Sequence, residues 1–270
     1  MLLHTVLRLL GVSCLLVFCF AHTAFAKKHT VMIVLTHGDD LANIAPLPAK
    51  YAAEGHAVYY AIFTGLQGAV GEPGSKGHEE LLCASRELGI KDTFVLRGPA
   101  GEGHATNAAI AQRLIELINQ TKPDVIITWG PDGLTGHPRH IMVGNVVTRV
   151  FQQQGLLRHK PRKLYYIAYP ETLFPDDRLP LGGVFRQVPF GTVSDIFITT
   201  KVDARRHLNR SRKAIACHTT PDLATRPSRS GETFEQSWNR VTGTTLGGKV
   251  FLRLAVPASR GRETDIFKGL

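Results

Sequence analysis

Apolar runs that end in polar or glycine-rich segments recur along this chain. The first covers residues 31–35, which are continuously apolar and rich in branched side chains, a pattern typical of a strand buried on both faces. Similar runs at 57–64, 93–96 and 125–129 predict further strands, and the stretches that end near residue 54, at 88 and near 119 predict helices between them. This alternation predicts an α/β fold with one mostly parallel sheet and helices on both faces.

The second half of the chain continues the alternation less regularly. It predicts a helix at 137–153, strands at 163–169 and 194–200, a helix at 204–216 and a last strand at 249–255. Residues 225–245 are polar and lack apolar periodicity, which predicts a loop. No linker divides the chain, so residues 27–270 are expected to form a single domain whose active site gathers at the carboxyl ends of the strands.

The first 26 residues have the pattern of a secretory signal peptide. Arg8 is their only charged side chain, an apolar run follows it, and Ala24 and Ala26 are the small residues that a signal peptidase prefers. The apolar run is shorter than the roughly 20 residues that cross a bilayer. We expect cleavage after Ala26, a mature chain that begins at Lys27, a secreted or periplasmic location, and no stable membrane insertion after cleavage.

Composition narrows the class of protein. Of 270 residues, 43% are hydrophobic and 20% are charged, which excludes disordered, collagen-like and polytopic membrane proteins. The net charge of +10 modestly favours an anionic environment or substrate polymer. The segment 204–216 is basic but has no interleaved aromatic residues, so it predicts a solvated face and no nucleic-acid partner. Its cations are Arg205, Arg206, Arg210, Arg212 and Lys213.

Two cysteines, Cys83 and Cys217, follow the leader. An exported protein is free to form disulfides, but nothing in the sequence places these two residues within the distance that a bridge requires. The sequence therefore favours two separate buried thiols. It sets no oligomeric state.

Residues capable of chemistry directly follow two of the predicted strands. His37-Gly38-Asp39-Asp40 ends the first strand, and His137-Pro138-Arg139-His140 stands where a later strand leads into a helix. Proline at the first helical position would place His137 and His140 on one face of the first turn. Two imidazoles and a carboxylate form the ligand set of a catalytic zinc with one open position, and four groups here compete for three places.

Each motif alone also has an ordinary explanation. A lone His-x-x-His is most often a surface feature, and paired aspartates after a strand are often a helix cap. The occurrence of both motifs, each directly after an apolar strand, favours a metal site. A spare carboxylate beside such a site would accept a proton from water and a spare imidazole would stabilise an oxyanion, which predicts metal-assisted hydrolysis of an amide or ester.

The two motifs described above, together with three further short motifs, resemble those of a known family. The motifs, in the correct order, are similar to those of the PIG-L family, also called LmbE-like, of zinc-dependent de-N-acetylases with a Rossmann-like fold. The resemblance covers about residues 30–150 and is weaker at 212–218. It rests on residues 37–40, 52–56, 87–90, 122–128 and 136–140.

The resemblance implies a role for each polar residue of the two motifs. It implies His37, Asp40 and His140 as zinc ligands, Asp39 as the general base that acts on the zinc-bound water, and His137 as the group that stabilises the oxyanion and protonates the amine. Other divalent metals would also suit these ligands.

The chain departs from the family pattern at three positions in or beside the motifs. Gly38 stands where the family usually has proline, Leu41 stands where it commonly has an acid, and Arg139 stands where it usually has aspartate. A cation in place of that aspartate is expected to lower the pKa of His137. Asp132 is an alternative partner for His137. Arg97, Asp132 and His218 are weaker candidates for contact with the substrate.

These observations together predict an exported hydrolase that removes an N-acetyl group from an N-acetylglucosamine-type amino sugar or glycan. Two alternatives stay open. The same metal site would serve a different amide or ester, and a non-catalytic carbohydrate-binding relative would share the fold. Asp39 argues against the second alternative, because a binding protein needs no base.

Overall fold

One seven-stranded sheet organises the chain, in the order β3-β2-β1-β4-β5-β7-β6. The computed structural model describes residues 27–63, 73–96, 107–174, 191–220, 232–257 and 261–270. The strands are β1 (Thr30–Leu35), β2 (Ala57–Phe63), β3 (Asp92–Leu96), β4 (Val125–Thr128), β5 (Lys163–Ile167), β6 (Thr200–Asp203) and β7 (Lys249–Val256). The first five are parallel, whereas β7 is antiparallel to both β5 and β6. The expected mostly parallel α/β sheet is confirmed.

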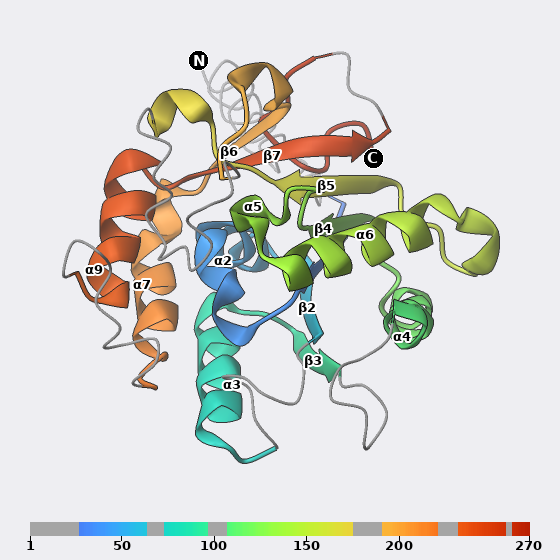
Figure 1. Ribbon diagram of the computed structural model, residues 1–270, viewed down its shortest axis with the longest axis horizontal. Helices are drawn as coiled ribbons and strands as arrows, with labels where there is room; N and C mark the ends of the chain where they lie inside the picture. The colour runs from blue at the N-terminus through green and yellow to red at the C-terminus, as the bar shows by residue number, and fades with distance from the viewer. Residues whose placement is uncertain (1–26, 64–72, 97–106, 175–190, 221–231, 258–260) are drawn as a thin grey trace, which may run out of the picture.

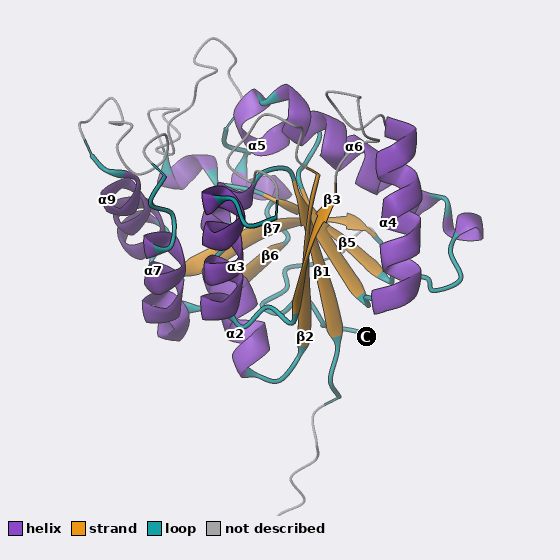
Figure 2. Cartoon of the chain, turned by 90° about the horizontal axis from the view of Figure 1, so that it is seen from below, coloured by secondary structure: helices purple, strands orange, loops and turns teal. Residues whose placement is uncertain are grey.

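Helices cover both faces of this sheet (Figures 1 and 2). One face carries α2 (Pro46–Ala53), α3 (Lys76–Leu88), α7 (Leu208–Ala216) and the short α9 (Phe234–Trp238). The other carries α4 (Asn107–Thr121) and α6 (Pro138–Gln152), which follows the single-turn α5 (Gly133–Gly136). Because it lies between these layers, β1 is buried throughout from Val31 to Leu35.

Most predicted elements are confirmed, but two are wrong. Residues 195–197 form a 3-10 helix, and the strand that follows, β6, begins only at Thr200. The predicted loop at 225–245 contains α9 and a π-helix (Asn239–Thr245) in its described part. Thr233 caps α9 by accepting a hydrogen bond from the Gln236 amide, and Trp238 is fully buried. Val241, three residues further on, is also fully buried, and Phe234 packs against the core, so this mostly polar segment contributes to the core through a few apolar residues at helical spacing.

The expectation of two separate thiols is also wrong, because Cys83 and Cys217 form a disulfide. Helices α3 and α7 lie side by side on one face of the sheet, which brings the two Cα atoms to 5.8 Å although 134 residues separate them in sequence. Glu80 reinforces this junction, since its carboxylate accepts hydrogen bonds from the amide and hydroxyl of Thr219 and from the hydroxyl of Thr220. The chain just after α7 is thus fixed to α3.

The predicted leader, residues 1–26, lies outside the described part of the chain. Within the described part, none of the helices has the length and apolar character needed to cross a membrane.

Candidate metal centre

The carboxyl end of β1 supplies the first half of the site. A 3-10 helix (Gly38–Asn43) follows directly, and the Asp40 carboxylate folds back to accept hydrogen bonds from the amides of Thr36 (3.0 Å) and His37 (2.7 Å). Tyr60, on the neighbouring strand β2, donates its hydroxyl to the His37 carbonyl at 2.7 Å. These contacts hold the turn closed, with Asp40 buried and both His37 and Asp39 half-buried.

The carboxyl end of β4 supplies the second half. Beyond Trp129 the chain turns through α5 and enters α6 at Pro138, the first helical residue. His137 caps this helix, because its Nδ1 accepts a hydrogen bond from the Arg139 amide at 3.1 Å. His140 is therefore in the first turn of α6, where it is buried.

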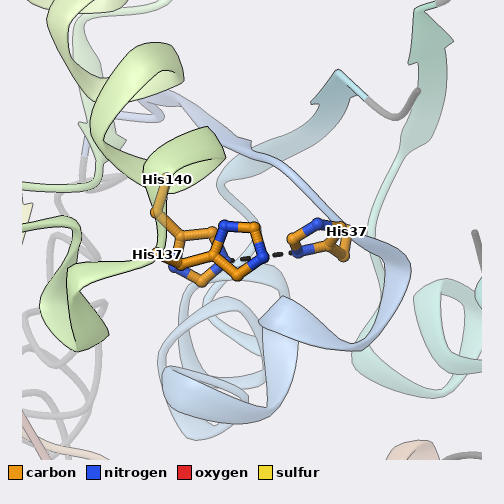
Figure 3. A group of neighbouring side chains, drawn as sticks. All are labelled: His37, His137 and His140. Atoms are coloured by element: carbon orange, nitrogen blue, oxygen red, sulfur yellow. Dashed lines mark hydrogen bonds between the residues drawn. The ribbon is translucent and has the colours of Figure 1, made fainter. Parts of the chain in front are cut away.

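The two halves meet because β1 and β4 are hydrogen-bonded neighbours in the sheet. His140 Nε2 lies 3.2 Å from His37 Nδ1 and 3.3 Å from Asp40 Oδ1, and His37 Nδ1 lies 3.4 Å from Asp40 Oδ2. Figure 3 shows the imidazoles of His37, His137 and His140 turned toward one another. Asp39 belongs to the same cluster, because one of its carboxylate oxygens lies within 4.8 Å of the ligand atoms of His37 and Asp40.

These donor atoms fit a divalent cation. His140 Nδ1 lies 3.0 Å from the Gly133 carbonyl, and a carbonyl only accepts hydrogen bonds, so the ring proton is on Nδ1. Nε2, which faces Asp40 and His37, is therefore the nitrogen that a cation would take, as in the outer-shell arrangement of metal-binding histidines. Trp129 supports the ring from behind, since the two rings are stacked at 4.1 Å with an interplanar angle of 2°.

The two adjacent aspartates have opposite pKa shifts. For Asp40, burial acts to raise the pKa, but the charge and hydrogen bonds of His140 and His37 outweigh it and hold the pKa well below its usual range. For Asp39, burial and then the charge of Asp40 raise the pKa to about 6. Asp40 is thus a fixed anion suited to a cation, and Asp39 is a carboxylate that exchanges its proton near neutral pH.

The histidines are shifted as well. Burial lowers the pKa of His37, but its hydrogen bond to Asp40 and the charges of both aspartates produce a net rise. Burial lowers the pKa of His137 to about 4, with further contributions from His140 and His37 and a smaller one from Arg139. His137 is therefore neutral at pH 7, and because its Nδ1 accepts a hydrogen bond, its proton is on Nε2. This state suits a hydrogen-bond donor to an oxyanion better than a proton donor to an amine.

The weaker candidates lie elsewhere or have other partners. Asp132 accepts hydrogen bonds from Arg253 (3.1 Å) and from the Leu134 amide (3.4 Å), so the structure pairs it with Arg253 where the sequence suggested His137. His218 is buried just beyond α7, where its ring contacts Phe234. Arg97 lies outside the described residues.

Two residues that support the site were not predicted from the sequence. Trp129 was identified only as the end of a buried strand, and Arg253 was not singled out at all. The signal for Trp129 was its place directly before the glycine-rich turn. Arg253 gave no signal, because its contact with Asp132 spans 121 residues.

A known protein family matches the part of the chain that contains both motifs. The family model described as GlcNAc-PI de-N-acetylase, PIG-L, matches residues 32–151. A 1D-myo-inositol 2-acetamido-2-deoxy-alpha-D-glucopyranoside deacetylase from Nocardiopsis dassonvillei is 30% identical over 88% of this chain and 100% of its own length. The protein of the same name from Acidothermus cellulolyticus is 28% identical over 89% of this chain and 95% of its own length.

Solved structures share the fold at low sequence identity. N,N'-diacetylchitobiose deacetylase from Pyrococcus horikoshii superposes with a TM-score of 0.55 at 14% identity, covering 86% of each chain. GalB, the 4-carboxy-2-hydroxymuconate hydratase from Pseudomonas putida KT2440, gives a TM-score of 0.56 at 14% identity over 86% of this chain and 98% of its own. The second match shows that proteins with different named activities share this fold.

Proposed function

This chain belongs to the PIG-L family of de-N-acetylases, and from that premise we propose that it is an exported deacetylase that removes the acetyl group from an N-acetylglucosamine-containing substrate with a bound zinc ion. PIG-L deacetylases are metal-dependent amide hydrolases. The observation that carries the proposal is the convergence of His37, Asp40 and His140 within 3.4 Å of one another, with Asp39 beside them. Two imidazole nitrogens and a carboxylate suit zinc, although other divalent ions accept the same ligands.

In this proposal His37, Asp40 and His140 hold the cation. When bound, the cation would supply Lewis-acid polarisation of the acyl carbonyl and would make water more acidic. Asp39 accepts the proton of the attacking water and returns that proton to the departing amine. His137 donates the hydrogen on its Nε2 to the oxyanion of the tetrahedral intermediate.

The substrate class rests on the relatives. Both curated relatives described above are named as deacetylases of an inositol-linked acetamido sugar, and the Pyrococcus structure is named as a diacetylchitobiose deacetylase. Export and the net charge of +10 favour an acetylated glycan or metabolite outside the cytoplasm, with an anionic polymer as the preferred case. The disulfide supports export, because such bonds persist in oxidising compartments.

Acetate release is the direct test. The purified mature protein, supplied with zinc, is incubated with an inositol-linked N-acetylglucosamine and with N-acetylglucosamine oligomers. We expect acetate and a free amine from at least one of them, and loss of activity with a chelator. Asp39→Asn should reduce kcat by about 10²- to 10⁴-fold, because general base catalysis contributes that much. The matched control is Asp92→Asn, which changes an exposed carboxylate at the start of β3.

Two results would contradict the proposal. If Asp39→Asn deacetylates as fast as the unmodified protein, Asp39 is not the base. If no acylated amino sugar releases acetate while another amide or an ester is cleaved, the metal site serves the alternative hydrolase activity.

A further inference from the structure

We infer that Arg253 is a positioning residue of the metal centre, which holds the turn that presents His140 by binding Asp132. The inference rests on the proposed function, because it concerns the same metal site. Arg253 lies on β7, more than 100 residues beyond the last residue matched by the family model. It pairs in register with Tyr166 on β5, and its guanidinium lies over the Tyr166 ring at 5.6 Å.

The local sequence makes room for this contact. A Cβ atom on Gly130 would lie only 2.0 Å from Arg253 Nη2 and 2.6 Å from Asp132 Oδ1. Any side chain at position 130 would therefore displace the ion pair. Glycine, which has no Cβ atom, leaves the space in which Arg253 and Asp132 meet. The ion pair is largely shielded from solvent, with exposed side-chain fractions of 20% for Arg253 and 16% for Asp132.

The turn at residues 133–136 is strained and depends on contacts with neighbouring residues. Gly133 and Leu134 both have positive φ angles, of 61° and 62°, and a leucine in that conformation is strained. Asp132 holds this turn with two hydrogen bonds. Its side chain accepts one from the Leu134 amide, and its backbone carbonyl accepts one from the Gly136 amide at 3.0 Å. Arg253 in turn fixes the Asp132 carboxylate.

The turn connects directly to a proposed metal ligand. The Gly133 carbonyl accepts the hydrogen of His140 Nδ1, which sets the orientation of the ring and directs Nε2 at Asp40 and His37. If Arg253 releases Asp132, the turn is free to relax and the Gly133 carbonyl moves relative to His140. The Gly133 carbonyl is the outer-shell partner of His140, and loss of such a partner weakens metal binding by about 10- to 100-fold. Because Arg253 acts on this carbonyl through Asp132, its loss is expected to fall at the lower end of that range.

Zinc affinity of the full mature chain tests the inference. The dissociation constant is measured by competition with a chromophoric chelator for the unmodified protein, Arg253→Met, Asp132→Asn and the double variant. We expect each single variant to bind zinc about 10-fold more weakly. The double variant should be no weaker than the weaker single variant, because both act through one contact. Arg253→Lys keeps a cation and should restore part of the affinity.

Arg205→Met is the matched control. It removes another arginine–aspartate pair, the exposed pair of Arg205 with Asp203 at the end of β6, and should leave zinc affinity unchanged. Unchanged affinity in Arg253→Met, or additive losses in the double variant, would overturn the inference. A raised KM with unchanged zinc affinity would also overturn it, because Arg253 would then contact substrate. If Arg253→Met does not fold, Arg253→Lys and Asp132→Asn decide by the same criteria. Failure of the unmodified protein to bind zinc would refute the proposed function itself.

Discussion

Asp39 and Asp40 are neighbours in the chain, yet their surroundings assign them opposite tasks. Asp40 accepts two backbone hydrogen bonds and lies against two imidazoles, so its charge is compensated from several directions. Asp39 has a raised pKa, chiefly because of burial and secondly because of the charge on Asp40. The charge on Asp40 helps to raise the pKa of Asp39, whereas His140 and His37 hold the pKa of Asp40 low, so Asp40 is the carboxylate that stays ionised.

Arg139 gives a residue-level prediction for His137. Burial is the main reason for the low pKa of this histidine, and Arg139 adds a smaller contribution in the same direction. Arg139→Asp removes a cation and adds an anion, and both changes favour the protonated imidazole. We therefore expect the pKa of His137 to rise by about one unit, measured by NMR titration of the metal-free protein.

Arg139→Gln is the control for that titration, because it removes the cation without adding an anion and should give a smaller rise. If His137 has the same pKa in both variants as in the unmodified protein, the charge at position 139 does not affect the ring.

The residues that meet at the site were predictable to different degrees. The two motifs that carry His37, Asp40 and His140 could be expected to meet because each follows an apolar strand and parallel strands end at a common edge. The choice of these three residues as ligands came from the family resemblance. Arg253 could not, since its contact depends on where the last strand enters the sheet. Periodicity predicts that a strand exists but does not predict its neighbours.

At the scale of elements, the contact between α3 and α7 shows the same limit. The amphipathic pattern of each helix predicts which of its faces is buried. It does not predict which other helix lies beside that face, so it could not show that the two cysteines are close enough to form a disulfide. The two mistaken segments have a similar cause. Residues 194–200 have the composition of a strand, but their ladder with β7 begins only at Thr200, and before it only Thr199 among the residues 194–199 donates a backbone hydrogen bond to β7. Helix α9 depends on a local cap and on the burial of Trp238.

The disulfide between these helices should contribute substantially to stability. Replacing both Cys83 and Cys217 with alanine removes a cross-link across 134 residues of chain. We expect the free energy of unfolding, measured by urea denaturation, to fall by about 2–4 kcal/mol.

Dithiothreitol provides the control for this prediction. It should lower the urea midpoint of the unmodified protein toward that of the double variant and leave the double variant unchanged. Equal midpoints for all four samples would mean that the purified protein does not contain the bridge.

At the scale of the whole molecule, we propose that the chain is exported and that its leader is removed. Lys28 Nζ donates to the Glu54 carbonyl at 2.6 Å, so contacts with the fold begin directly after the proposed cleavage point. The mass of the protein recovered from outside the cytoplasm should correspond to a chain that begins at Lys27.

Substituting the small residue at the cleavage point tests this directly. Ala26→Phe should prevent processing and retain the leader, because signal peptidase prefers a small residue there. Recovery of the unmodified protein only inside the cell, with its first 26 residues intact, would contradict the proposal.

The position of β7 has a consequence for how the molecule is made. Strand β5 is flanked by β4, which precedes it, and by β7, which is synthesised about 80 residues later. Until the last strand arrives, a nascent chain has an open sheet edge at β5, where unpaired backbone groups invite association with other chains. The edge of β5 is therefore covered, and Arg253 is brought to the metal centre, only after β7 has been made, so a chain that stops before β7 would be prone to aggregation and would lack the contact with Asp132.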